Sequence, residues 1–207
     1  MIDHLAQIET EITTHDVESK IVVGIDGYSG IGKTTTLKEL AQRNQNILAV
    51  NRDDFIIPRK SFETLLSQAS DKSVIFETEM LDLKKIRGFI TAFRTSDTIY
   101  QTTIFNSDSG RCDIEQKYDL SKKILVLEGI FLFHPKQLND VFDVKIFLDG
   151  DIDAADQRRI KREKERWGKD YFPHNHPDSY FRFVRIAFER YIKVCKPKES
   201  ADLVISV

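Results

Sequence analysis

The chain has 207 residues, of which 41% are hydrophobic and 31% charged, so it can bury a sizeable core and is not expected to be disordered. Its 31 Lys and Arg residues are balanced by 33 Asp and Glu residues, which argues against a protein whose main role is to coat nucleic acid. Two cysteines are too few for a disulfide framework, and no apolar run approaches the roughly 20 residues of a membrane span. Because the acidic start Met1-Ile2-Asp3 also lacks the features of a signal peptide, we expect one cytoplasmic domain with reduced cysteines and no nucleic-acid or membrane partner.

The apolar pattern predicts alternating strands and helices. The runs at 21–25 and 124–127 are continuous and largely β-branched, as in strands buried on both faces of a parallel sheet. In chain order, the expected elements are a helix over 3–15, strand 21–25, helix 33–43, strand 47–50, helix 81–93, two strands or a hairpin around 98–105 and 111–118, strands 124–127 and 144–148, helices 154–167 and 179–194, and strand 203–205. This order predicts an α/β fold in which a mostly parallel, five-stranded sheet lies between two layers of helices.

A glycine-rich turn between the first strand and its helix carries the strongest motif. Residues 27–34 fill the pattern G-x-x-x-x-G-K-S/T without a gap. In this pattern, glycines let backbone N–H groups turn toward phosphate oxygens, the lysine reaches the β- and γ-phosphates, and the hydroxyl that follows it binds Mg²⁺. The alternative is a plain glycine-rich turn with a surface lysine. The residues expected to hold a nucleoside triphosphate are Gly27, Tyr28, Ser29, Gly30, Ile31, Gly32, Lys33, Thr34 and Thr35.

Carboxylates follow two of the other strands. Asp53 and Asp54 come after the second strand, and Glu128 ends the run Leu125–Leu127. Ligands of open α/β sheets bind at the carboxyl ends of the strands, so these acids are candidates to hold Mg²⁺ with Thr34 or to take a proton from an acceptor hydroxyl. The alternatives are an N-cap or turn for the Asp pair and an ordinary strand end for Glu128.

A basic segment covers the helix expected at 154–167. Arg158 and Arg162 are four residues apart, and Arg159 and Arg162 three, so guanidinium groups share one helical face. Phosphoryl transfer develops negative charge that such arginines can offset. The alternative is a solvated helix in which Glu163 and Glu165 pair with the basic residues.

These motifs together resemble the uridine kinase, phosphoribulokinase and nicotinamide riboside kinase group. The resemblance rests on Gly27–Thr36, Asp53-Asp54-Phe55, Leu127–Ile130, the arginine-rich helix and the ending Lys196–Ile205, and it is weakest over 57–118. It implies a single P-loop kinase domain over 1–207 with a three-layer αβα core, a substrate-side insertion at about 57–118 and a helical lid at about 156–175. It also implies ATP and Mg²⁺ as cofactors.

The resemblance assigns roles to individual residues. Asp53 falls on the catalytic base and lies beside the metal, while Asp54 is a metal or water partner or a structural neighbour. Arg159 and Arg162 match the arginines of the lid that contact phosphate. Thr34 and Glu128 match the Mg²⁺ ligands, and Lys33 is the lysine that contacts the transferred group.

The acceptor side matches the family less well. Uridine kinases carry Tyr-Asp-Phe followed by a histidine, whereas this chain has Tyr100-Gln101-Thr102 with Phe105 where the histidine should fall. Glu77 occupies the place of an acid directed at ribose hydroxyls, or caps a helix. Arg166 corresponds to a substrate-side arginine after a one-residue slip. The expected substrate contacts are therefore Asp53, Glu77, Tyr100 and Arg166.

Three functional hypotheses follow. The first is an ATP-dependent kinase that phosphorylates a hydroxyl of a small metabolite, with a nucleoside or ribose-like acceptor. The second is a regulatory P-loop protein that binds nucleotide without an acceptor, and the third is a polynucleotide 5′-hydroxyl kinase, which the balanced charge disfavours. The pair His174 and His176 is interpreted as part of a loop and not as a metal site. The sequence leaves open the acceptor, ATP against GTP, and whether the chain forms a homo-oligomer.

Overall fold

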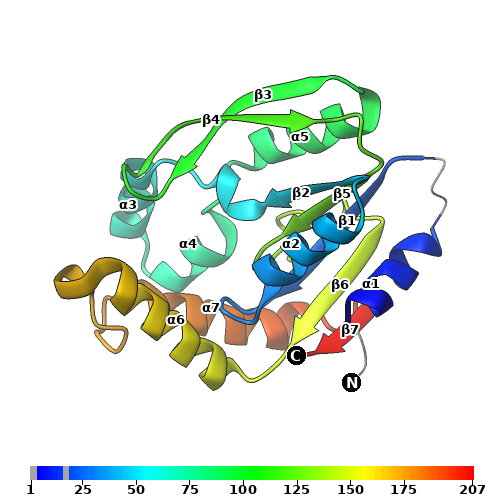
Figure 1. Ribbon diagram of the computed structural model, residues 1–207. Coiled ribbons are helices and arrows are strands. Elements are labelled where there is room, and N and C mark those ends of the chain that lie inside the picture. Colours follow the sequence, from blue (N-terminus) through cyan, green and yellow to red (C-terminus); the bar gives the residue numbers. More distant parts are fainter. Residues whose placement is uncertain (1–3, 16–18) are drawn as a thin grey trace.

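A five-stranded parallel sheet forms the centre of the protein in the computed structural model, which describes residues 4–15 and 19–207 (Figure 1). The strands are β1 (Ile21–Gly27), β2 (Ile47–Asn51), β5 (Ile124–Glu128), β6 (Val144–Asp149) and β7 (Leu203–Ser206), in the spatial order β2-β5-β1-β6-β7. Each neighbouring pair is parallel, so the carboxyl ends of all five strands lie along one edge. The predicted sheet is therefore confirmed, and it is wholly parallel.

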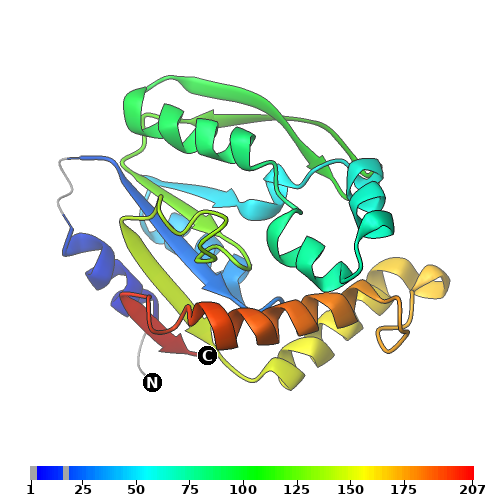
Figure 2. The same cartoon turned by 180° about the vertical axis from the view of Figure 1, so that it is seen from behind.

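Helices cover both faces of this sheet (Figures 1 and 2). On one face lie α1 (His4–Thr13) and α2 (Lys33–Arg43), and on the other lie α5 (Leu83–Thr95) and α7 (Tyr180–Cys195). The apolar sides of these helices join the strand residues in one core, for example through Leu40 of α2 and Phe89 of α5, both fully buried. The layers match the predicted αβα arrangement. Asp3, the first residue of the predicted N-terminal helix, lies outside the described residues. No described helix is long and apolar enough to cross a membrane.

The chain between β2 and β5 forms a separate group of elements at the β2 edge of the sheet (Figure 1). It begins with the short 3₁₀ helix η1 (Arg52–Phe55), continues through α3 (Arg59–Gln68), α4 (Lys72–Thr78) and α5, and ends in the antiparallel pair β3 (Ile99–Asn106) and β4 (Arg111–Asp119). The hairpin and α5 agree with the sequence within two residues. Sequence patterns missed α3 and α4, which are only ten and seven residues long.

The arginine-rich segment forms the 16-residue helix α6 (Ile152–Trp167), followed by the 3₁₀ turn η2 (Gly168–Asp170). The helix begins where the side chain of Asp151 accepts hydrogen bonds from the backbone N–H groups of Asp153 and Ala154. Arg185 of α7 pairs with Asp153 and Asp156, at 2.6 and 3.0 Å, and so holds the first turns of α6 against α7.

A buried carboxylate ties the end of β1 to the rest of the core. Asp26 is fully buried and accepts hydrogen bonds from the backbone N–H of Gly27 at 2.6 Å, the N–H of Phe133 at 3.1 Å and the hydroxyl of Tyr191 at 2.6 Å. Burial raises the pKa of Asp26, while the three donors oppose this shift. The loop that begins at Gly27 is thus anchored to α7 and to the segment after β5.

Replacing Tyr191 by Phe is expected to lower the free energy of unfolding by about 1–3 kcal/mol, because the buried Asp26 carboxylate loses one of its donors. Chemical denaturation at pH 7 measures the change. Tyr100→Phe is the matched control. The Tyr100 ring packs edge-on against Phe89, and removal of its hydroxyl should change the free energy of unfolding little. Equal losses in both variants would contradict the anchoring role of Tyr191.

Candidate active site

A cleft of about 490 Å³ opens at the carboxyl edge of the sheet. Its walls come from four segments that are far apart in the sequence: the turn after β1, the end of β2, the end of β5 and one side of α6. Its lining residues are Ser29, Gly30, Gly32, Lys33, Thr34, Thr35, Asn51, Asp53, Glu128, Gly129, Ile130, Arg158, Arg159 and Arg162. The structure therefore brings together the glycine-rich turn, two of the three acids predicted at strand ends, Asp53 and Glu128, and the predicted arginines.

The glycine-rich turn has the backbone that its glycines allow. Gly30 and Gly32 have φ values of 86° and 116°, which side-chain-bearing residues rarely adopt. A Cβ on Gly30 would stand 2.7 Å from the carbonyl oxygen of Ala155 in α6, so the turn also lies directly against that helix. Of the predicted nucleotide-binding residues, Gly27, Tyr28 and Ile31 do not line the cleft. The side chains of Tyr28 and Ile31 are buried in the core.

Lys33 is buried at the first turn of α2. Its Nζ donates to the carbonyl oxygens of Gly27 and Tyr28, at 2.9 and 2.8 Å, so the ammonium group lies within the curve of the loop. Burial lowers the pKa of Lys33, and the carboxylates of Glu128, Asp26 and Asp53 oppose that effect. A cation held in this way faces the space where the loop can bind phosphate oxygens.

Two polar side chains donate hydrogen bonds to Glu128 at the end of β5. The hydroxyl of Thr34 donates to Glu128 Oε1 at 2.8 Å, and the side-chain amide of Asn51 donates to the same atom at 2.9 Å. Burial raises the pKa of Glu128, and nearby Lys33 counteracts the rise. A hydroxyl and a carboxylate are the hard oxygen ligands that Mg²⁺ prefers, so Thr34 and Glu128 fit this ion. Asn51 was not predicted as a site residue. In the sheet, the parallel pairing of β2 with β5 places it directly beside Glu128.

The structure separates the two adjacent aspartates. The backbone N–H of Asp53 donates to the Asn51 side chain at 2.8 Å, and the Asp53 carboxylate lines the cleft with 63% of the side chain exposed. Asp54 does not line the cleft; its carboxylate accepts a hydrogen bond from the hydroxyl of Tyr118 in β4, at 2.7 Å. Burial raises the pKa of Asp54. Asp53 is thus the member of the pair that can meet a bound molecule.

Three arginines of α6 form the remaining wall of the cleft. The guanidinium group of Arg159 lies 4.0 Å from the centre of the Phe181 ring, and Arg158 Nε donates to the carbonyl oxygen of Gly30 at 3.0 Å. Arg162 is mostly exposed. Arg159 is therefore held by stacking, whereas Arg162 is exposed and paired with its neighbour Glu163, at 3.7 Å.

Two predicted substrate contacts lie elsewhere. Glu77 is buried in α4 and forms an ion pair with Arg190 of α7, with Nε and Oε2 2.7 Å apart. The ring of Tyr100 packs against Phe89. Neither residue lines the cleft, and neither is retained as a substrate contact. Glu77 does not reach the cleft because it lies on the unpredicted helix α4, which packs on α7 and turns the carboxylate toward Arg190.

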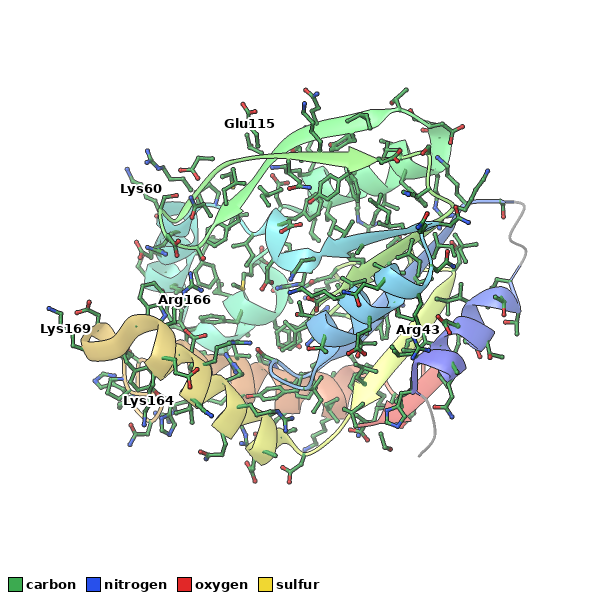
Figure 3. The ribbon with its side chains drawn as sticks, viewed as in Figure 1. Arg43, Lys60, Glu115, Lys164, Arg166 and Lys169 are labelled. Atoms are coloured by element: carbon green, nitrogen blue, oxygen red, sulfur yellow. The ribbon has the colours of Figure 1, made fainter. Side chains whose placement is uncertain are left out.

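Arg166, the third predicted substrate contact, also lies outside the lining of the cleft. Its guanidinium group donates to Ser107 Oγ at 2.7 Å and to Asp108 Oδ1 at 2.5 Å, both in the turn between β3 and β4. In Figure 3, Arg166 lies on the side of α6 nearest to α3, whereas Lys164 lies on the opposite side. Arg166 therefore joins the end of α6 to the hairpin.

Groups that could bind a transition metal are found away from the cleft in the described part of the chain. Glu77, His134 and Cys195 bring ligand atoms within 4.8 Å of one another. However, the backbone N–H of Lys136 donates to His134 Nδ1, which leaves the proton on the Nε2 that faces Glu77, and Arg190 already pairs with this carboxylate. His174 and His176 do not belong to this group.

Replacing Glu128 by Gln is expected to raise the Mg²⁺ concentration needed for half-maximal activity by at least about tenfold, because the ion would lose a charged ligand. The measurement is a Mg²⁺ titration at fixed nucleotide concentration. Glu39→Gln, on the exposed side of α2, is the matched control. An unchanged Mg²⁺ requirement in Glu128→Gln would remove Glu128 from the metal site.

A parallel sheet with a phosphate-binding loop after β1, acids at neighbouring strand ends and a basic helix over the cleft defines a P-loop kinase fold. A family model described as "Phosphoribulokinase / Uridine kinase family" matches residues 22–207. The chain belongs to this family.

Individual relatives agree with this assignment. A uridine kinase of Listeria welshimeri is 28% identical, over 89% of this chain and 86% of its own length. Two Arabidopsis thaliana proteins, a uridine/cytidine kinase and uridine kinase-like protein 3, are 28% and 30% identical, and the chain spans 37% and 43% of their lengths. Among solved structures, one described as a possible uridine kinase from Bacillus stearothermophilus has a TM-score of 0.70 at 19% identity, covering 97% of this chain and 96% of that one. Phosphoribulokinase from Rhodobacter spheroides has a TM-score of 0.61 at 13% identity, covering 91% and 70%. These two likenesses establish the fold.

Proposed function

We propose that the protein is an ATP-dependent, Mg²⁺-requiring kinase that transfers the γ-phosphoryl group to a hydroxyl of a small metabolite. The observation that carries the proposal is the convergence of Lys33, Asp53, Glu128 and Arg159 on one cleft of about 490 Å³. A P-loop alone is consistent with nucleotide binding. An aspartate and arginines facing it across the same cleft supply what transfer to an alcohol requires.

Each residue of the cleft has its own role in the proposed reaction. The loop amides and Lys33 hold the phosphates of ATP, and Thr34 and Glu128 would hold Mg²⁺, which when bound offsets the charge of the phosphate oxygens. Asp53 orients the acceptor hydroxyl and takes its proton as the new P–O bond forms. Arg159 and Arg162 offset the charge that develops on the transferred group.

The neighbouring segments complete this proposal. Residues 57–118 form the acceptor side, and residues 156–175 form a lid that closes over the cleft and excludes water, which favours transfer to an alcohol over hydrolysis. The link between Arg166 and Asp108 joins these two parts. Two free cysteines are in keeping with a cytoplasmic location.

The proposed acceptor is a nucleoside or another ribose-like molecule. The support is membership of the family together with the uridine kinases among the relatives. Two of the predicted acceptor contacts, Glu77 and Tyr100, do not line the cleft.

A screen for ADP release tests the proposal. Purified protein is supplied with MgATP and a panel of nucleosides, ribosyl compounds, pantothenate and sugar phosphates. We expect one acceptor class with kcat/KM above about 10⁴ M⁻¹s⁻¹. Slow hydrolysis with no phosphorylated acceptor would favour a regulatory nucleotide-binding protein, and steeply salt-dependent binding of oligonucleotides would favour a polynucleotide kinase.

A further inference from the structure

Arg52 is a fully buried arginine directly beside the proposed base. It lies in η1, immediately after β2, with 1% of its side chain exposed. Nη1 donates to Asp53 Oδ1 at 3.2 Å, while Nε and Nη2 have no hydrogen-bond partner. A buried guanidinium group with two unpartnered nitrogens is costly, so its presence calls for a physical reason.

The surroundings of Arg52 supply that reason. Burial lowers its pKa, and the nearby carboxylates of Asp53, Asp26 and Glu128 act in the opposite direction. The same three carboxylates also act on Lys33, so two buried cations are balanced by one set of acids at and beneath the cleft. When phosphates enter this space, the negative charge on Asp53 is opposed by further negative charge. A fixed cation behind Asp53 offsets that repulsion.

The end of β5 is shaped to admit this side chain. A Cβ on Gly129 would stand 2.6 Å from both Cβ and Cδ of Arg52. Because Gly129 has no side chain, the stem of Arg52 can lie against the backbone just beyond Glu128. Contacts from the β2 end and the β5 end therefore fix the position of the guanidinium group.

We propose that Arg52 is a positioning residue, which acts through Asp53 by holding its carboxylate in a fixed orientation at the edge of the cleft. Arg52 does not line the cleft, so it does not contact the reacting groups itself. It supplies the side-chain hydrogen bond that the structure shows for the Asp53 carboxylate, while Asn51 fixes the Asp53 backbone. The inference rests on the proposed function of Asp53 and adds Arg52 as a residue on which that function depends.

A double-mutant cycle tests the coupling. Arg52→Met is made alone and together with Asp53→Asn, and turnover is measured with the acceptor that reacts best in the panel. We expect Arg52→Met alone to lower kcat by about 10- to 100-fold, because a displaced base costs this much. Nucleotide affinity, titrated with a non-hydrolysable ATP analogue, should change less than about twofold. In the Asp53→Asn background, Arg52→Met should lower kcat by less than about twofold, because the residue through which it acts has gone.

Two further variants keep the test decisive if Arg52→Met folds poorly. Arg52→Lys retains a cation but not the planar fork, and is expected to recover part of the kcat. Gly129→Ala keeps the arginine but displaces its stem, and should reproduce the kcat loss only when Asp53 is present. Arg87→Met, which breaks an exposed ion pair with Asp140 away from the cleft, is the control and should retain wild-type turnover. Thermal unfolding of every variant reports its folding.

The outcomes separate the two proposals. Equal kcat losses from Arg52→Met in both backgrounds, or wild-type turnover in Arg52→Met, would overturn the positioning role and leave the function of Asp53 intact. Wild-type turnover in Asp53→Asn, or a panel in which the wild-type protein phosphorylates nothing, would instead overturn the proposed function and the role of Arg52 with it.

Discussion

Replacing Asp53 by Asn is expected to cut turnover by at least about 10²-fold while the affinity for nucleotide stays nearly unchanged. Asn has the same size and keeps a polar side chain, but it cannot accept the proton of the acceptor hydroxyl. The backbone of residue 53 remains held by Asn51, so the local turn should persist. Turnover is measured as ADP release with the best acceptor, and affinity by titration with a non-hydrolysable ATP analogue.

Asp54→Asn is the matched comparison for this experiment. Its carboxylate accepts a hydrogen bond from Tyr118 and does not line the cleft. We therefore expect turnover close to wild type, with some loss of thermal stability. If Asp54→Asn abolished turnover and Asp53→Asn did not, the base would be Asp54 and the assignment above would be wrong.

Replacing Lys33 by Met is expected to lower kcat/KM by about 10² to 10³-fold, the usual effect of removing one group that offsets charge in a transition state. The ammonium group is the buried cation inside the loop, held by the carbonyl oxygens of Gly27 and Tyr28. Methionine fills the same volume without the charge. Steady-state kinetics with MgATP measure the loss, and thermal unfolding shows whether the loop has kept its fold.

Lys38→Met provides the control for this variant. Lys38 lies on the exposed side of the same helix, so its loss removes a charge of equal sign without reaching the cleft. Its kcat/KM should equal that of the wild type. A similar loss in both variants would mean that net charge, and not the position of Lys33, determines the effect.

Local patterns were sufficient to predict the central sheet and the helices that cover it. Continuous, largely β-branched runs such as Ile21–Ile25 are typical of strands buried on both faces, and a phosphate-binding glycine-rich turn stands between a strand and a helix. Because parallel strands end at one edge, the sequence also predicted that Lys33 and Glu128 would meet, as they do in the cleft. The short helices α3 and α4 escaped because neither offers enough turns for a clear periodicity.

The parts of the site that sequence could not supply depend on distant contacts. The residue types of Asp53 and Asp54 do not distinguish them; their contacts do, for example the hydrogen bond of Asp54 with Tyr118, 64 residues later. Glu77 is directed by α7, which follows about 100 residues later, and not by its own neighbours. Nothing in the sequence distinguishes Arg52 from a surface arginine, because its contact with Gly129 is a tertiary one. Side-chain direction in short turns is set by tertiary packing, which local patterns do not encode.

The contact between Gly30 and α6 has a consequence for how the two substrates affect each other. Arg158 donates to the Gly30 carbonyl, and the Gly30 backbone leaves no room against Ala155. Any shift of the loop on nucleotide arrival is therefore transmitted to the helix that carries Arg162. If the proposed acceptor also binds against this helix, thermodynamic linkage requires that nucleotide and acceptor change each other's dissociation constants by one common factor, whichever of them is added first.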